Sequence, residues 1–213
     1  MSGILDLLNS DLGKTIISGV SGQTNQPEDK TSSVLTMALP VLMQAMKRNA
    51  STPQGAEGLL GALNNSKHDG SILDNLGGLF SGGVDSSVLD DGSKILGHVL
   101  GNKQQNVANT LGAKSGMDAA SVAQILKVAA PILMGVLGKE SRQSNVSSQS
   151  GLEGLLGGLI KGNSPQQEQS FLESILDADG DGSVIDDVAG MVLGGNKKKS
   201  GLEGLLGGLF GNK

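Results

Sequence analysis

Two stretches of the chain are apolar at helical spacing on nearly every side, and they predict the two central helices of the fold. In the later stretch, residues 121–138, apolar residues recur at intervals of three and four, which is the spacing of one helix face. These positions are Val122, Ile125, Leu126, Ala129, Ile132, Leu133, Val136 and Leu137. Because Val128, Ala130 and Met134 make the opposite side apolar as well, the pattern is typical of a helix in the middle of a bundle.

The earlier stretch, residues 33–47, repeats this pattern in the same register. Aligning Pro40 with Pro131, an offset of 91 residues, superposes the apolar positions of the two stretches. Each proline is predicted to kink its helix or make it restart, because proline lacks an N–H and its ring crowds the carbonyl four residues earlier. Asp118 is a candidate N-cap for the later helix. The shared register indicates an internal duplication.

The rest of the pattern predicts short helices separated by glycine-rich turns. Helices are expected within residues 5–20, 57–65, 71–80, 94–100, 105–116, 151–163 and 165–176, with connectors at 81–93 and 140–150. The prediction is an all-α protein of two tandem, related helical units, residues 1–91 and 92–195. A lysine linker and a leucine- and glycine-rich tail follow at residues 196–213.

Composition supports a helical core and limits the chemistry. Aromatic residues make up only 1% of the chain and glycines number 34 among 213 residues, which favours short, close-packed helices of aliphatic residues. The absence of cysteine excludes disulfides, thiolate zinc sites and a cysteine nucleophile. A net charge of −5 disfavours nucleic acid as a partner. The first residues carry no signal-peptide pattern, and no apolar run approaches the length of a membrane span. We therefore expect a cytoplasmic protein.

Three consecutive segments resemble a known family. They are GSKILGHVLG at residues 92–101, NVANTLGAKSGM at 106–117 and QILKVAAPILMGVLG at 124–138. Together they are similar to the bacterial YidB-like family known as domain of unknown function 937, with a partial repeat at residues 13–47. The resemblance is strongest over residues 92–138. It implies an all-helical fold with homeodomain-like short helices, and it implies no activity, because the family has no established catalytic residues.

An acidic loop between two predicted helices is the sharpest chemical signal. The sequence D-x-D-x-D-G-S matches a calcium loop of the EF-hand or dockerin type, which needs carboxylates at positions 1, 3 and 5, glycine at 6 and a backbone carbonyl at 7. The candidate Ca²⁺ ligands are Asp177, Asp179, Asp181, Ser183 and Asp187. Position 12 is Val188 instead of a bidentate acid, so Asp187 would have to serve in a loop shortened by one residue. The alternative is an acidic turn whose aspartates cap helices. The matching loop of the first unit has Ser81, Gly83 and Asp85 at the coordinating positions and is not expected to bind.

The motif GLEGLLGGL occurs twice, at residues 151–159 and 201–209. Its glycines form G-x-x-x-G pairs, Gly154 with Gly158 and Gly204 with Gly208, a spacing that lets two helix backbones approach closely. One interpretation is self-association or docking on a protein partner, and another is attachment to a membrane surface. The simplest is a tail that folds back on its own core.

No catalytic motif is present, and the protein is predicted not to be an enzyme. His68 and His98 are the two histidines, and His98 has no acid–base partner nearby in the sequence. A helix-turn-helix interpretation of residues 106–126 is weak. Its would-be recognition helix, residues 118–130, carries only Lys127 as a basic residue. The preferred hypothesis is a non-enzymatic structural or interaction protein, calcium-stabilised and self-associating. The alternatives are a calcium-responsive regulator and, less favoured, a DNA-binding protein.

Overall fold

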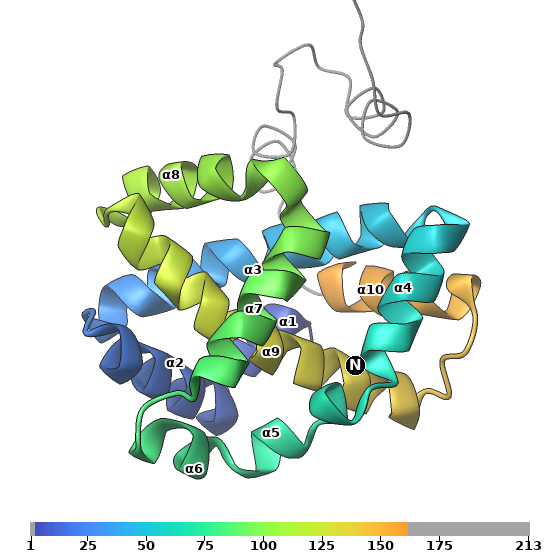
Figure 1. The fold of residues 1–213 in the computed structure, drawn as a ribbon, viewed down its shortest axis with the longest axis horizontal. Coiled ribbons are helices and arrows are strands. Elements are labelled where there is room, and N and C mark those ends of the chain that lie inside the picture. Colours follow the sequence, from blue (N-terminus) through green and yellow to red (C-terminus); the bar gives the residue numbers. More distant parts are fainter. Residues whose placement is uncertain (1–2, 162–213) are drawn as a thin grey trace, which may run out of the picture.

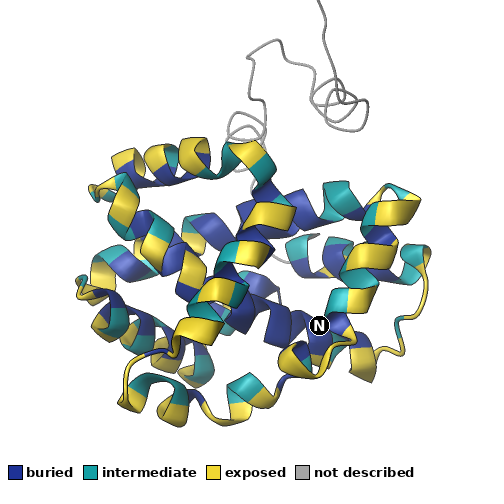
Figure 2. Cartoon of the chain, viewed as in Figure 1, coloured by how far each residue is buried: buried dark blue, intermediate teal, exposed yellow. Residues whose placement is uncertain are grey.

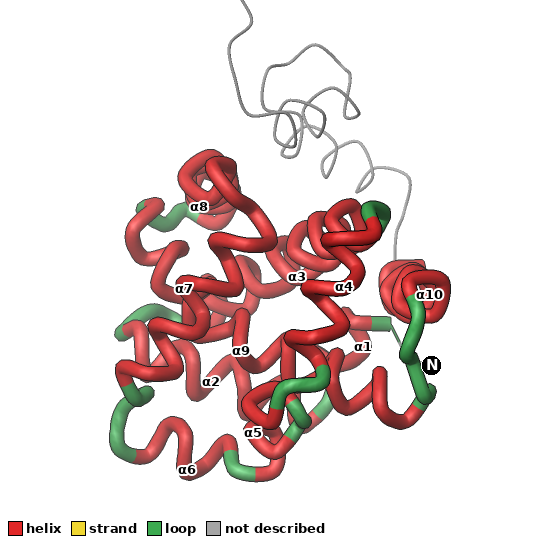
Figure 3. The backbone as a smooth tube through the Cα atoms, turned by 45° about the vertical axis from the view of Figure 1, so that its right-hand side comes forward, coloured by secondary structure: helices red, strands yellow, loops and turns green. Residues whose placement is uncertain are grey.

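Every regular element of the described chain is helical. The computed structural model describes residues 3–161, and its helices are arranged as in Figures 1 and 3. They are α1 (Ile4–Asn9), α2 (Asp11–Thr24), α3 (Glu28–Ala50), α4 (Pro53–Leu63), α5 (Ser71–Asp74), α6 (Leu76–Ser81), α7 (Ser86–Leu100), α8 (Gln104–Ser115), α9 (Ala119–Gln143) and α10 (Gln149–Lys161), with 3₁₀ turns η1 (Ser66–His68) and η2 (Gly101–Lys103). The predicted all-α class is confirmed over this range.

The two proline-containing helices, α3 and α9, form the centre of the fold, and the shorter helices pack around them (Figures 1 and 2). Each helix runs without a break through its proline, Pro40 or Pro131, and both prolines are buried. The predicted possibility of a restart at proline is therefore wrong. An interior proline costs about 3 kcal/mol, but each buried Leu, Ile or Val around it contributes about 1.5–3 kcal/mol, so packing holds the helix together.

One hydrophobic core joins the two predicted units. A single cluster of buried residues draws on α1 to α4 and equally on α7 to α10. The predicted boundary between residues 91 and 92 falls inside α7, which begins at Ser86 instead of near residue 94. Asp85 starts this helix early, because its carboxylate accepts a hydrogen bond of 2.7 Å from the Ser87 N–H. The glycine, serine and aspartate content of residues 81–93 had favoured a connector there.

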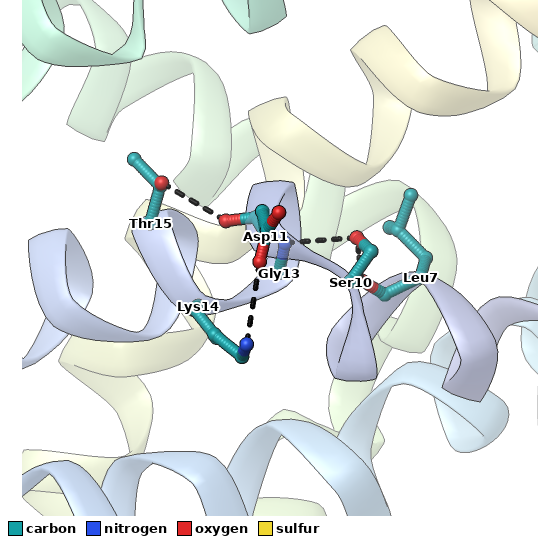
Figure 4. Close-up of polar contacts among 6 residues, drawn as sticks. All are labelled: Leu7, Ser10, Asp11, Gly13, Lys14 and Thr15. Atoms are coloured by element: carbon teal, nitrogen blue, oxygen red, sulfur yellow. Dashed lines mark hydrogen bonds and ion pairs between the residues drawn. The ribbon is translucent and has the colours of Figure 1, made fainter.

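A serine separates the first two helices (Figure 4). The Ser10 hydroxyl accepts from the Gly13 N–H at 3.2 Å and donates to the Leu7 carbonyl at 2.6 Å. One side chain therefore ends α1 and caps α2. The helical stretch predicted within residues 5–20 is divided into two helices for this reason. Beyond the cap, Lys14 pairs with Asp11 at 3.2 Å on an exposed face.

Two glycines let other backbones lie directly on or against α9. A Cβ added to Gly92 of α7 would collide with the Lys127 carbonyl, and one added to Gly138 of α9 would collide with the His68 carbonyl. Side chains at these positions would push α7 and η1 away from the central helix. The second crossing brings His68 into the core, and it is where the first candidate site lies.

α9 also meets the length and composition of a membrane span. It has 25 residues, and its most apolar 18-residue window has a mean hydropathy of 1.8, which the broken apolar runs of the sequence did not suggest. However, 72% of that window is buried inside the fold. A central core helix passes the same criteria as a membrane-spanning one, so this helix is explained by its position in the bundle.

Candidate functional site

A buried histidine–aspartate pair joins η1 to α7. The His68 Nε2 lies 2.8 Å from Asp91 Oδ2, and His68 Nδ1 lies 2.9 Å from the Ala62 carbonyl oxygen. The side chain of His68 is 7% exposed and that of Asp91 is 22% exposed. Sequence reasoning missed this pair because the two residues are far apart in the chain and meet only through tertiary packing.

The hydrogen bonds of His68 leave it no free nitrogen. A carbonyl only accepts, so Nδ1 must carry a proton and donate to Ala62. If Asp91 is ionised, Nε2 also carries a proton; if Asp91 is protonated, the Nε2 lone pair accepts from it. In either state no ring lone pair remains to take a proton from a nucleophile, so the pair serves to connect two elements.

An open cavity of ≈ 550 Å³ lies beside this pair, between α5, α6 and α7. Its apolar lining includes Ile72, Leu79 and Val88, and Asp91 with the hydroxyls of Ser71 and Ser87 adds polar atoms. The two serines have no available histidine base, since His68 is fully engaged. Lys67 and Asn75 complete the polar part of the lining.

The predicted calcium ligands, Asp177, Asp179, Asp181, Ser183 and Asp187, lie outside the described residues. Within residues 3–161, no group of three or more His, Cys, Asp or Glu side chains gathers as a metal site would require. In the matching loop of the first unit, Asp85 caps α7. Its hydrogen bonds with Ser87 hold the pKa of Asp85 below its ordinary value.

The first GLEGLLGGL copy forms α10, and its leucines and glycines face opposite ways. Leu152 and Leu156 are fully buried, and Leu155 and Leu159 are only 6% and 5% exposed. α10 packs against α3, α4 and α9, and we term the surface that these three helices offer it the α10-contact surface. Figure 3 shows α10 at the edge of the bundle. A Cβ added to Gly154 or Gly158 would meet nothing within 4 Å. The glycine pair thus faces away from the core and is not used for packing inside this fold.

The start of α10 is anchored by side chains. The Ser148 hydroxyl accepts from the Gly151 N–H at 3.2 Å and so acts as an N-cap. The Gln149 side chain donates to the Ser51 carbonyl at 3.2 Å, which connects α10 to the junction of α3 and α4. α4 carries a related sequence, EGLLGAL at residues 57–63, and its own N-cap Thr52 accepts from Gly55 N–H at 3.1 Å.

The would-be recognition helix of the helix-turn-helix interpretation is the first half of α9. Asp118 is its N-cap, as predicted, and accepts from the Ser121 N–H at 2.9 Å. Hydrogen bonds from Ser121 hold the pKa of Asp118 below its ordinary value. From Val122 onward most residues of the helix are buried. A DNA-reading helix must present a face to the groove, and α9 presents only isolated positions such as Gln124 and Lys127.

The described residues form an all-helical protein built on two proline-containing core helices. The chain belongs to the family described as "Bacterial protein of unknown function (DUF937)", whose model matches residues 6–140 and 142–213. The predicted resemblance is confirmed, and the match also covers the C-terminal third of the chain. No curated protein and no solved structure matches the chain.

Proposed function

We propose that this protein is a non-enzymatic interaction protein that self-associates through its leucine–glycine segments. The observation that carries this proposal is the orientation of α10. Its leucines are buried on the α10-contact surface, and its Gly154–Gly158 face has open space above it. Such a face permits a second helix to approach closely, and the chain contains another copy of the same motif at residues 201–209.

The state of the histidine supports a non-enzymatic role. His68 is the one buried histidine among the described residues, and both of its nitrogens are engaged. The other, His98, is exposed on α7 and has no part in the cavity beside Asp91. These arrangements fit a protein that packs against or docks on a partner better than they fit an enzyme.

Sedimentation of the full chain over a wide concentration range tests self-association. We expect the mass to rise with concentration. The variant Gly154→Leu/Gly158→Leu fills the open face of α10 and should shift the association midpoint to at least about ten-fold higher concentration, since each lost close contact is worth on the order of 1 kcal/mol. The matched control is Gly58→Leu on α4, where a side chain also meets open space. A mass that stays monomeric throughout would refute the proposal.

A calcium-responsive role is the second candidate, and the acidic loop at residues 177–187 favours it. Calorimetric titration of the intact protein with Ca²⁺ would measure saturable heat, with Mg²⁺ as competitor. The variant Asp179→Ala/Asp181→Ala should lose that heat. Equal traces for both proteins would leave the loop as an acidic turn.

We infer that the two proline-containing helices arose by internal duplication. α3 starts at residue 28 and α9 at residue 119, the same offset of 91 that aligns the prolines. α4 and α10 start at residues 53 and 149, the offset of 96 that aligns their leucine–glycine motifs. The homeodomain-like arrangement stays an expectation from the family resemblance.

A further inference from the structure

The chain carries two nearly identical copies of the helix that covers the α10-contact surface. Residues 200–209 repeat residues 150–159 without a change, and the next residue is Phe210 in place of the half-buried Ile160. The four buried leucines of α10 therefore have exact counterparts, Leu202, Leu205, Leu206 and Leu209. Every apolar side chain that α10 places in the core at these four positions is available a second time.

We propose that residues 200–210 compete with α10 for the α10-contact surface within one chain. The surface recognises a row of leucines on one side of a helix, in the manner of a helix bound in a groove. The glycines that face solvent in α10 impose no demand on the surface, and they recur unchanged in the second copy. The occupant is thus a segment of this chain that lies outside the described residues.

The length of chain between the two copies permits this exchange. Residues 162–199, a segment of about 40 residues, separate α10 from the second copy and can span more than about 100 Å when extended. This exceeds the distance from the end of α10 back to its start many times, since a helix of this length is about 20 Å long. Intramolecular binding is favoured over binding to another molecule by the high effective concentration of a tethered segment.

The differences between the copies favour α10 by a modest factor. Lys198 stands where α10 has its capping Ser148. Loss of an N-cap lowers the equilibrium constant for forming the helix about five-fold. Lys199 replaces Gln149 and keeps a donor for the Ser51 carbonyl. The four glycines of α10 weaken it as an isolated helix, so the copy that packs is held mainly by its leucines. α10 is the main occupant and the tail a minor one.

This inference rests on the proposed function in one respect: the copy that occupies the α10-contact surface presents the open glycine face proposed for association. Exchange itself is an event within a monomer, and it can be measured below the concentration at which association begins. The chain has no cysteine, so engineered pairs can be joined by a short bifunctional maleimide without background. The distance between Gln149 and Ser51 supplies the reference geometry.

The experiment compares three cysteine pairs in the dilute full-length protein. Ser51→Cys/Gln149→Cys reports α10 in place, Ser51→Cys/Lys199→Cys reports the tail in its place, and Ser51→Cys/Asn212→Cys reports random collision of the tail. We call these the 149, 199 and 212 pairs, after the position joined to residue 51. We expect the 199 pair to link within the chain about five-fold more slowly than the 149 pair, and several-fold faster than the 212 pair. A 199 pair that links no faster than the 212 pair would overturn the proposal, as would links formed only between chains.

Two matched substitutions should move the 199 linkage in opposite directions. Leu206→Asp disables the tail and should reduce its rate to that of the 212 pair. Leu156→Asp disables α10 and should raise it. Leu156→Asp can also unfold the protein, so a second variant leaves α10 unchanged and strengthens the tail instead. Gly204→Ala/Gly208→Ala should raise the rate of linkage between positions 51 and 199 by at least about five-fold, because alanine favours the helix more than glycine does. An unchanged rate in this last variant would contradict the competition, whatever the sedimentation result for association.

Discussion

The helices α3 and α9 share one register, yet α9 buries 15 of its 25 residues and α3 buries 12 of its 23. At the offset of 91, buried residues coincide: Val34 with Ile125, Leu35 with Leu126, Leu42 with Leu133 and Met43 with Met134. The difference lies at two positions. α9 has Gly135 and Gly138 where α3 has Gln44 and Lys47, and only at the glycines do η1 and α5 lie against the helix.

This contrast shows how one helical pattern gives two environments. The apolar period determines which face each helix buries, and it is the same in both. The loss of two side chains then opens a second face of α9 to a crossing backbone, whereas the half-exposed Gln44 and Lys47 keep that face of α3 in contact with water. Four sets of substitutions, given in order of decreasing effect, test the comparison.

The shared register is tested by Leu35→Ala and Leu126→Ala. Both leucines are at most 2% exposed, so each variant should lose about 2–5 kcal/mol of unfolding free energy through lost burial and the cavity left behind. Urea denaturation followed by circular dichroism gives the values. A loss at one site more than about twice that at the other would show that the two helices are not equivalent in the core.

The second face is tested by Gly138→Ala. Its methyl group would collide with the His68 carbonyl, and the resulting shift of η1 should cost about 1–3 kcal/mol. Lys47→Ala at the matching position of α3 should stay within about 0.5 kcal/mol of the parent. The same denaturation curves report both, and a neutral Gly138→Ala would mean that η1 does not rest on α9.

A buried hydroxyl marks another difference. Thr31 of α3 is fully buried and its Oγ1 has no hydrogen-bond partner, whereas the matching residue of α9 is the fully buried Val122. Thr31→Val should therefore raise the unfolding free energy by about 1 kcal/mol, because it removes an unsatisfied polar group at similar volume. Val122→Thr is the reciprocal control and should lower it. A destabilised Thr31→Val variant would reveal a partner for the hydroxyl.

The smallest expected effect concerns the helix starts. α9 begins at the capping Asp118, while α3 begins after Pro27, which offers no side-chain cap. The pKa of Asp118 is lowered from 3.8 by the hydrogen bonds of Ser121, so its contribution is complete above pH 3.8 and disappears as the pH falls through the folded-state value. Thermal melts should show Asp118→Ala less stable than the parent at pH 6 and level with it at strongly acidic pH. A difference that persists in acid would exclude the ionised cap as its cause.

Much of the local structure could be predicted because its causes are local. The period of apolar residues located α3 and α9, and Asp118 was identified as a cap from its place before an apolar run. The start of α7 was missed, since the residues that cap and begin it also compose loops. Of the candidate sites, the leucine–glycine segment was found in the sequence, and its inward leucines and outward glycines emerged only from packing.

The sequence alone determined that this protein is helical, that two of its helices share a register, and that it belongs to a family of bacterial proteins, because spacing and motif are properties of neighbouring residues. Only the tertiary structure decided that His68 meets Asp91, that the two predicted units share one core, and that α9 carries crossing backbones on a second face. Those outcomes depend on which apolar surfaces pack against one another and are removed from water. The residues that meet in this way are far apart in the chain, so no local sequence pattern predicts their contact.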